Sequence, residues 1–291
     1  MLIDTHAHLY WPDYEKDFDD VIQRAINAGV TTIINVGVDV EKSKEALDQV
    51  LNTDWPDNLQ VYCTIGIHPH ESIKYDPDVS LPAGRHSIHE DIKQLEQIYQ
   101  SDTGKVIAVG ECGLDYYFRD AEIASSQTPR NDEKELQKKL FQAQIDLAKK
   151  LNLPLIVHCR DDRSKNPENS EAWDEVLKMV GTHPTILHCY SGLSQTTNYV
   201  LRATNLLVSF AATITYPKNE YLREAAKLLP LEKIVLETDC PFLPPQSKRG
   251  QRNEPQAVKE IAQLIADLKN ISLEEVANQT TKNAESILKL S

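Results

Sequence analysis

The sequence predicts an α/β protein, a TIM-type (β/α)₈ barrel formed by a single domain over residues 1–291. Three observations lead to this prediction. Eight short apolar runs recur along the chain, amphipathic helical patterns lie between them, and 291 residues accommodate one barrel of about 250 residues with decorations. The chain shows neither a convincing domain linker nor an internal repeat.

The eight apolar runs are near strand length and rich in β-branched residues. They are nearly continuous rather than alternating, which is typical of parallel strands buried on both faces. Because strand and helix alternate eight times, a closed barrel is favoured over a doubly wound open sheet. The expected strands are Leu2–His8, Thr31–Val36, Val61–His68, Val106–Gly110, Leu153–His158, Thr185–His188, Leu206–Phe210 and Ile234–Glu237.

Helices are predicted where apolar residues recur at spacings of three and four, as over residues 136–151. Ser170 and Asn219 each precede such a pattern and are predicted to cap a helix with their side chains. Ser272 with Glu275 forms a predicted capping box before the last helix. These signals place helix starts between the expected strands.

Three segments are longer than a strand–helix connection requires. They are Glu71–Gln100, which is expected to contain a helix from Ile88 to Tyr99, Phe118–Asp132, and the polar segment Asp161–Asn169. Loops above the strand ends often shape a substrate pocket. Tolerated surface insertion explains such segments equally well, so both interpretations stay open.

Composition limits the class of protein. The hydrophobic content of 41% is ordinary for a soluble enzyme, and no apolar run approaches the roughly 20 residues that span a bilayer. The N-terminal segment has no signal-peptide pattern. We therefore expect a cytoplasmic protein without a membrane partner, and no feature indicates an obligate protein partner.

Cysteine content and charge exclude further classes. The five cysteines are odd in number and contain no CxxC pair, so neither a disulfide framework nor a thiolate zinc site is expected. A net charge of −13 argues against a protein that coats nucleic acid with its whole surface. It is compatible with an enzyme that meets phosphate through bound cations and a few local basic residues.

Six polar residues with metal-binding side chains collect at the expected carboxyl ends of strands, where barrel enzymes place their active sites. His6 and His8 end the first run, and a period of two puts both on the same face. A lone His at a strand end is more often structural. Six such residues on five strand ends would be costly to bury without a metal. The candidate ligands are His6, His8, Glu111, His158, His188 and Asp239.

Four imidazoles and two carboxylates suit two divalent ions, because one zinc ion normally takes three protein ligands and a water. Glu111 is placed to bridge two ions about 3.5–4 Å apart. Cysteines directly follow Glu111, His158, His188 and Asp239. Since neighbours in a strand face opposite ways, these thiols are expected to point toward the helices and pack there.

The motifs around these residues resemble those of the TatD family of metal-dependent hydrolases, TatD-related deoxyribonucleases of the amidohydrolase-like superfamily. The resemblance runs in order from Leu2 to about Pro255. The motifs are IDTHAHL, GIHPH, GECGLDYY, IVHCRD, LHCYSG, ETDCPFLPP and RGQRNEP, with the ending TTKNAESIL. The sequence departs from the family pattern in a longer segment after IVHCRD, an extended Phe118–Asp132 and a final helix without an aromatic ending. These departures leave the candidate ligands in place.

The resemblance implies a barrel with two divalent ions, Mg²⁺, Mn²⁺ or Zn²⁺. It also implies a deoxyribonuclease, often a 3′–5′ exonuclease, or alternatively a D-aminoacyl-tRNA deacylase. The expected DNA substrate is single-stranded or is attacked at its 3′ ends. One ion would be bound by His6, His8, Glu111 and Asp239, and the other by Glu111, His158 and His188.

Hydrolysis of a phosphodiester by a hydroxide that two ions activate follows from this expectation. Glu111 and Asp239 are the expected catalytic residues, with Asp239 accepting the proton of the nucleophile. His68 is implied to lie near the substrate phosphate. Arg249 and Arg252 are candidates for contacting phosphate, with a solvated basic turn as the alternative, and Arg160 is a further candidate.

Two competing functions remain open on sequence alone. An amidohydrolase acting on an ester, lactone or amide would share the ligands and the hydroxide. Glu111 stands where a carboxylated lysine would otherwise be expected, which favours the nuclease group. A non-enzymatic barrel, acting as a scaffold, would show the loss of a ligand, and none of the six is lost.

Overall fold

The computed structural model describes residues 1–75, 87–117 and 131–290. Within them, eight strands form one sheet in the order β1 to β8, and each neighbouring pair is parallel. The strands are β1 (Leu2–Ala7), β2 (Val30–Asn35), β3 (Gln60–Ile65), β4 (Val106–Asp115), β5 (Leu155–Arg160), β6 (Thr185–Leu187), β7 (Leu206–Phe210) and β8 (Ile234–Leu236).

The sheet closes where β1 meets the segment after β8. Ala7 and Cys240 form a parallel bridge, the amide of Asp239 donates to the carbonyl of His6 (2.9 Å), and the amide of His8 donates to the carbonyl of Cys240 (2.8 Å). The buried Asp4 carboxylate accepts from the amide and the hydroxyl of Thr238 (2.9 and 2.6 Å). The predicted (β/α)₈ barrel is thereby confirmed, and the open sheet is excluded.

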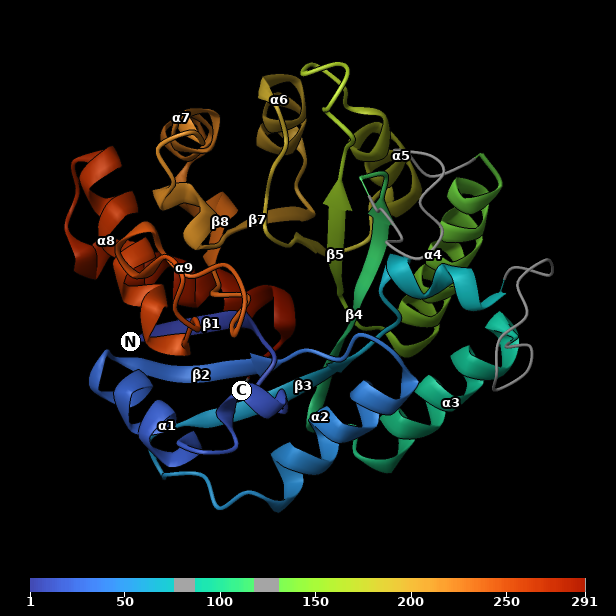
Figure 1. Cartoon of the computed structure of the whole chain (residues 1–291), viewed down its shortest axis with the longest axis horizontal. Helices are drawn as coiled ribbons and strands as arrows, with labels where there is room; N and C mark the ends of the chain where they lie inside the picture. The colour runs from blue at the N-terminus through green and yellow to red at the C-terminus, as the bar shows by residue number, and fades with distance from the viewer. Residues whose placement is uncertain (76–86, 118–130, 291) are drawn as a thin grey trace.

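Helices surround the strands, as Figure 1 shows. Beyond the first eight, α9 follows α8 directly and packs against β1 and β8. The helices are α1 (Phe18–Asn27), α2 (Val40–Asn52), α3 (Ile88–Ser101), α4 (Asn131–Leu151), α5 (Glu171–Val180), α6 (Ser194–Arg202), α7 (Glu220–Leu228), α8 (Val258–Lys269) and α9 (Leu273–Leu288). No helix of the described ranges has the length and apolar composition needed to cross a membrane.

The eight predicted strands are confirmed, but the predicted ends of the third and fourth were wrong. Strand β3 ends at Ile65 rather than His68. Strand β4 continues past Gly110 to Asp115, so Glu111 lies inside the strand rather than after it. Gly113 pairs with His158 of β5, and a Cβ at Gly113 would collide with the His158 carbonyl oxygen. Glycine at this position therefore lets the two strands approach closely.

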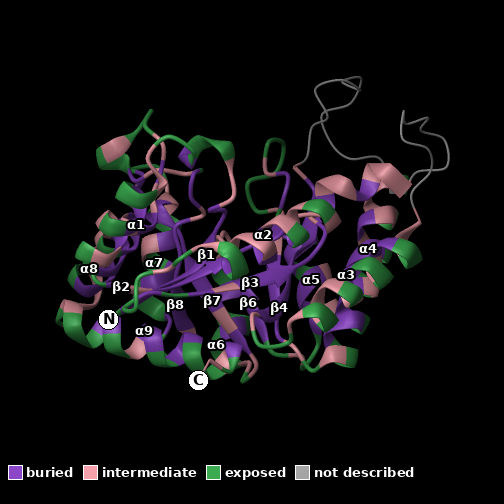
Figure 2. Ribbon diagram, turned by 90° about the horizontal axis from the view of Figure 1, so that it is seen from below, coloured by how far each residue is buried: buried purple, intermediate pink, exposed green. Residues whose placement is uncertain are grey.

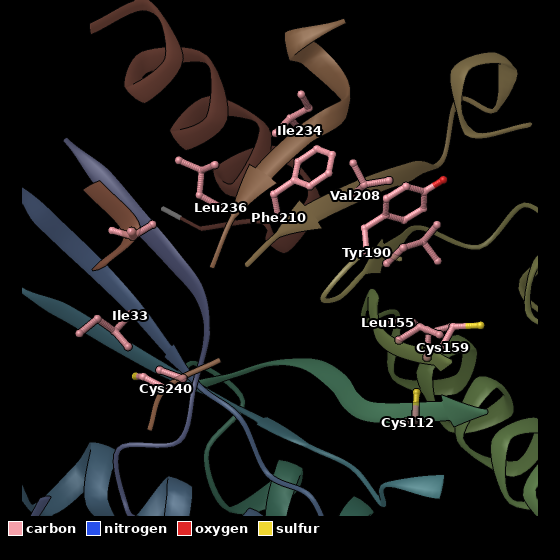
Figure 3. Close-up of a cluster of buried hydrophobic side chains, with 14 of the residues drawn as sticks. Ile33, Cys112, Leu155, Cys159, Tyr190, Val208, Phe210, Ile234, Leu236 and Cys240 are labelled. Carbon is pink, nitrogen blue, oxygen red and sulfur yellow. The ribbon is translucent and has the colours of Figure 1, made fainter. Parts of the chain in front are cut away.

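Two layers of apolar side chains hold the barrel together. The larger cluster joins the outer faces of the strands to the helices, and Figure 3 shows part of it around Tyr190 and Phe210. The smaller cluster draws on six strands and, among the described helices, only on α9, through Ala284 and Leu288. It therefore fills the inside of the barrel. Figure 2 shows this burial along the strands, with exposed residues on the outer helix faces.

The cysteines that follow the candidate ligands are mostly packing residues, as predicted. Cys112, Cys159 and Cys240 are buried in the larger cluster (Figure 3). Burial raises the pKa of the Cys112 thiol well above its usual value, so the side chain is an apolar neighbour rather than a thiolate. All five cysteines are free. Cys189 differs, since it is half-buried and lies outside that cluster.

The helix expected from Ile88 to Tyr99 is present as α3, and the capping box of Ser272 and Glu275 is confirmed. Of the other two long segments, residues 118–130 lie outside the described residues, and Asp161–Asn169 is a connection without helix or strand. Ser170 and Asn219 do occupy N-cap positions, but neither side chain caps its helix. Those two capping predictions were wrong.

The side chain of Asp161 takes the place predicted for Ser170. Its Oδ1 accepts from the amide of Ala172 in the first turn of α5 (2.7 Å). The Ser170 hydroxyl instead donates to Asp174 and accepts from Gln195. Sequence reasoning missed this cap because the capping residue lies ten positions before the helix begins.

We predict that Asp161→Ala lowers the free energy of unfolding by about 1 kcal/mol, since it removes the acceptor for an amide at a helix start. Urea unfolding measures this loss. Ser170→Ala is the matched control and should cost less, because its partners Asp174 and Gln195 are exposed to water. An equal loss in both variants would assign the capping role to both residues.

Candidate metal centre

The six candidate ligands come together at the carboxyl ends of the strands. His6 and His8 lie at the end of β1, Glu111 in β4 and His158 in β5. His188 directly follows β6, and Asp239 follows β8. Tertiary structure thus gathers six side chains into one cluster, the outermost of which, His6 and Asp239, are 233 residues apart in sequence.

The carboxylate of Glu111 lies in the middle of this cluster. Its Oε2 is 3.4 Å from Nε2 of His6. Its Oε1 is 3.0 Å from Nδ1 of His158 and 3.4 Å from Nε2 of His188. The two oxygens therefore face different groups of imidazoles, which is the geometry that a bridging carboxylate requires.

The remaining ligand candidates lie on the Oε2 side of Glu111. Nε2 of His6 and Nε2 of His8 are 3.3 Å apart. Asp239 Oδ1 is 3.5 Å from Nε2 of His8 and 3.7 Å from Nε2 of His6. His6 and His8 at the end of β1 and Asp239 after β8 thus face one point.

The orientation of His8 leaves its Nε2 facing the cluster. Its Nδ1 lies 2.9 Å from the carbonyl oxygen of Val36. Because a carbonyl only accepts, Nδ1 is the donor in this bond, and Nε2 is the ring nitrogen that faces the neighbouring candidate ligands. This chemistry fits a divalent ion, since metal-binding imidazoles commonly donate their other ring nitrogen to an oxygen acceptor.

Two buried carboxylates that sequence reasoning missed orient His188 and His158. Oε1 of Glu237 lies 2.9 Å from Nδ1 of His188 and accepts from the amide of Cys189 (2.7 Å). Oδ2 of Asp115 lies 3.2 Å from Nε2 of His158. A usable signal existed, because Asp115 and Glu237 each lie an even number of residues from a candidate ligand in or beside the same strand.

His70 was also missed. Its Nε2 lies 2.9 Å from Oδ2 of Asp115, on the same oxygen that faces His158. His68 was predicted to contact substrate, and its Nε2 lies 3.4 Å from Oε1 of Glu111. The GIHPH motif therefore places both of its imidazoles beside the cluster.

Opposite charges compensate for the burial of this cluster. Burial alone raises the pKa of Glu111, but the surrounding imidazoles lower it well below the usual value. Burial lowers the pKa of His158, and its bonds to Asp115 and Glu111 outweigh that effect and raise it to about 9. Burial lowers the pKa of His68 to about 4. The carboxylates are thus ionised, as metal ligands must be.

The backbone around two of these residues adopts conformations that side chains rarely take. Asp239 has φ 57° and Cys189, next to His188, has φ 42°. Both lie in the left-handed region, which costs non-glycine residues about 1–3 kcal/mol and is concentrated at functional sites. This backbone strain is consistent with side chains of Asp239 and His188 that are held in fixed directions.

Three groups of side chains have ligand atoms within 4.8 Å of one another and could each hold an ion. Within the described residues these groups are His6 with His188 and Glu237, His6 with His8 and Glu111, and His68 with Glu111 and His158. Nitrogen and oxygen donors of this kind suit Zn²⁺ or Mn²⁺. The arrangement can therefore bind divalent metal.

The arginines predicted to contact substrate are in different situations. Arg160 follows His158 by two residues on β5 and is exposed, with its guanidinium 4.0 Å from the ring centroid of Tyr117. Arg249 is exposed beside Tyr216, at 4.6 Å from the ring centroid. Both keep cationic surface that a phosphate can reach.

Arg252 is already occupied by internal partners. Its guanidinium donates to both oxygens of Asp17 (2.8 Å each) and to Glu254 (3.0 Å). Arg24 joins the same two carboxylates. This network fixes the loop after β8 against the start of α1. Its charge is compensated within the chain, so Arg252 holds this loop, and its contact with phosphate stays a prediction.

Comparison with known proteins agrees with this geometry. The sequence model of a family described as TatD related DNase matches residues 3–289. An uncharacterized metal-dependent hydrolase of Bacillus subtilis is 34% identical over 292 residues, covering 100% of both chains. A protein of Erwinia tasmaniensis named 3′-5′ ssDNA/RNA exonuclease TatD is 30% identical over 297 residues, covering 99% of this chain and 100% of its own.

Solved structures agree as well. The crystal structure of YJJV, a TATD homolog from Escherichia coli, superposes with a TM-score of 0.80 at 27% identity. The match covers 100% of this chain and 98% of that chain. Similarity therefore extends over the whole barrel and is not confined to the motifs around the cluster.

We predict that Glu237→Ala weakens divalent-metal binding by about 10- to 100-fold, because removal of a carboxylate that orients a ligand typically has this effect. Titration of Mn²⁺ into EDTA-stripped protein measures the affinity. Glu232→Ala, which removes an exposed carboxylate just before β8, is the control and should bind as the unmodified protein does. Unchanged affinity in Glu237→Ala would mean that His188 needs no such support.

Proposed function

Because the chain belongs to the TatD-related DNase family of metal-dependent hydrolases, we propose that it is a deoxyribonuclease that removes nucleotides from the 3′ ends of single-stranded DNA. The observation that carries this proposal is the Glu111 carboxylate, whose two oxygens face different imidazoles. Such a centre suits hydrolysis of phosphodiesters, whose negative charge two cations can neutralise. The exonuclease named among the relatives supports the choice of substrate.

The candidate ligands divide into two sets that share Glu111. His6, His8 and Asp239 would complete one set, and His158 with His188 the other. His68 lies as close to Glu111 as His188 does and would adjoin the second set. Two divalent ions, Mg²⁺, Mn²⁺ or Zn²⁺, would when bound supply a water of lowered pKa and a counter-charge for phosphate oxygens.

Asp239 is the residue that we propose to accept the proton of the attacking water. Burial raises its pKa, but His8 and the neighbouring imidazoles outweigh this and lower it, so the carboxylate is ionised. Its side chain is 14% exposed, against 6% for Glu111. Asp239 is therefore the more open of the two carboxylates toward a substrate, whereas Glu111 holds the centre of the cluster.

Phosphate oxygens would be bound by the cations that the structure leaves accessible. Arg160 continues the line of His158 along β5, and Arg249 lies in the loop after β8. His68 would add a neutral imidazole, which can donate or accept a hydrogen bond. With a net charge of −13, binding would be confined to this rim of the barrel.

The first experiment is hydrolysis of 3′-end-labelled single-stranded DNA by EDTA-stripped protein supplied with Mg²⁺, Mn²⁺ or Zn²⁺. We expect stepwise, metal-dependent loss of 3′ nucleotides that disappears in Asp239→Asn. Metal-loaded protein that cleaves no DNA would contradict the proposal. The same preparation would then be assayed on ester substrates such as D-aminoacyl-tRNA, the alternative that the same ligands permit.

Glu111→Ala is predicted to abolish turnover and to disturb both ions, because both sets of ligands lose their shared carboxylate. Metal content measured after gel filtration should fall for both ions, whereas Asp239→Asn should lose mainly activity. Retention of two ions per chain in Glu111→Ala would show that Glu111 does not bridge.

Arg160→Ala and Arg249→Ala are each predicted to raise KM for DNA more than for a neutral ester, since a charge-assisted contact to phosphate contributes about 1.5–3 kcal/mol. Steady-state kinetics at fixed ionic strength measures both constants. Arg252→Ala should instead lower the melting temperature, because it removes the partner of Asp17 and Glu254. Equal effects of Arg160→Ala on both substrates would dismiss its phosphate role.

A further inference from the structure

Two aromatic side chains adjoin the candidate metal centre beside His8. Trp11, in the loop after β1, and Phe242, in the loop after β8, lie with ring centroids 5.5 Å apart at an interplanar angle of 77°. Each ring lies 5.9 Å from the ring of His8. We call Trp11 and Phe242 the aromatic platform, and it is continuous with the His8 side of the cluster.

The platform is tied to the candidate ligands through the backbone. The amide of Trp11 donates to the carbonyl of His8 (3.2 Å), and the amide of Phe242 donates to the carbonyl of Asp239 (2.9 Å). The ring of Tyr10 packs beside that of Trp11, with 5.6 Å between the ring centroids. The rings therefore keep a fixed position relative to His8 and Asp239, which limits the entropy lost when a ligand binds.

The platform offers aromatic surface that the fold does not use. Phe242 is 43% exposed, whereas the other phenylalanines that the structure describes, Phe18, Phe141 and Phe210, are buried or partly buried. Trp11 is half-buried, and within the described ranges its indole N–H donates to no acceptor. An aromatic pair of one exposed and one half-buried ring beside the candidate metal centre is expected to serve a ligand rather than the core.

The platform rings themselves carry no charge, and the same rim carries two exposed cations. Arg160 stacks on Tyr117 above β5, which lies across the barrel from β1 and β8 in the strand order. Arg249 lies in the same loop after β8 as Phe242 and is exposed beside Tyr216. Neither platform ring has a Lys or Arg above it among the described residues, so the rings keep faces suited to a flat apolar group, and the two arginines are suited to phosphate.

We propose that the aromatic platform holds a base of the nucleic-acid strand, stacked face-on against one ring and meeting the other, at 77° to the first, with its edge, at the nucleotide whose phosphate is placed at the metal centre. The inference rests on the proposed nuclease function and names the part of the substrate that the rings recognise. Every base has a π-face, so stacking would bind any sequence, as in other proteins that hold single strands. Two rings are too small for a protein interface, and their contact with His8 limits the ligand to one that reaches the centre.

The test compares two fluorescein-labelled single strands of about ten nucleotides, within the length that such sites cover. One carries all its bases, and the other has abasic tetrahydrofuran residues at its 3′ end. Binding is measured by anisotropy on metal-loaded Asp239→Asn protein, which holds the strand without consuming it. Into this background we introduce Trp11→Leu, Phe242→Leu and the conservative Trp11→Phe. Tyr199→Leu is the control, since Tyr199 is an exposed aromatic on α6 (47% exposed).

Trp11→Leu and Phe242→Leu are expected to weaken binding of the complete strand at least about fivefold, as loss of one base–aromatic stack does. They should leave binding of the abasic strand unchanged. Trp11→Phe should retain most of the affinity, and Tyr199→Leu all of it. Equal weakening for both strands, or none for either, would overturn the stacking role.

The same strands separate this inference from the proposed function. DNA cleavage by protein with an intact Asp239, together with indifference of binding to Trp11→Leu, would refute the platform and leave the nuclease standing. Base-dependent binding without cleavage under any metal would refute the nuclease and retain the platform. Thermal melting of each variant checks that a loss of affinity is not a loss of fold.

Discussion

The carboxylate of Glu111 is the interaction on which the rest of the site depends. It lies within 3.4 Å of four imidazoles, and its own charge keeps that group of polar side chains compatible with the buried end of a barrel. Removal of one partner from a buried ionic group typically costs about 3–5 kcal/mol. Strand β4 positions this carboxylate, because it is long enough to include Glu111. Gly113 lets β4 lie against the backbone of His158.

A second set of buried carboxylates surrounds the first. Glu237 faces His188, Asp115 faces His158, and Asp4 joins β1 to the segment after β8. Each fixes the direction of a neighbouring group whose position the chemistry needs. Asp4 is fully buried, and this burial raises its pKa to about 8.

The rim of the barrel combines aromatic surface with exposed cations. The loops after β1 and β8 carry the aromatic platform and the Arg252 network, and the loop after β8 also carries the exposed Arg249. Strand β5 carries the exposed Arg160 on the opposite side. Since the whole chain is strongly acidic, these arginines are local cationic sites on an acidic protein.

Particular residues show how far sequence reasoning reached. Nearly continuous apolar runs located the eight strands, because strands buried on both faces leave such runs in the sequence. The metal-binding residue types at or just after the ends of those runs identified His6, His8, Glu111, His158, His188 and Asp239 as candidate ligands. The end of β4, the cap of α5 by Asp161, and the partners of Arg252 depended on contacts between distant segments, which no local pattern records. Sequence by itself determined the barrel and the kind of side chain at its mouth. Only the tertiary structure decided which atoms of Glu111 face which imidazoles, since distances between strands arise when the sheet closes.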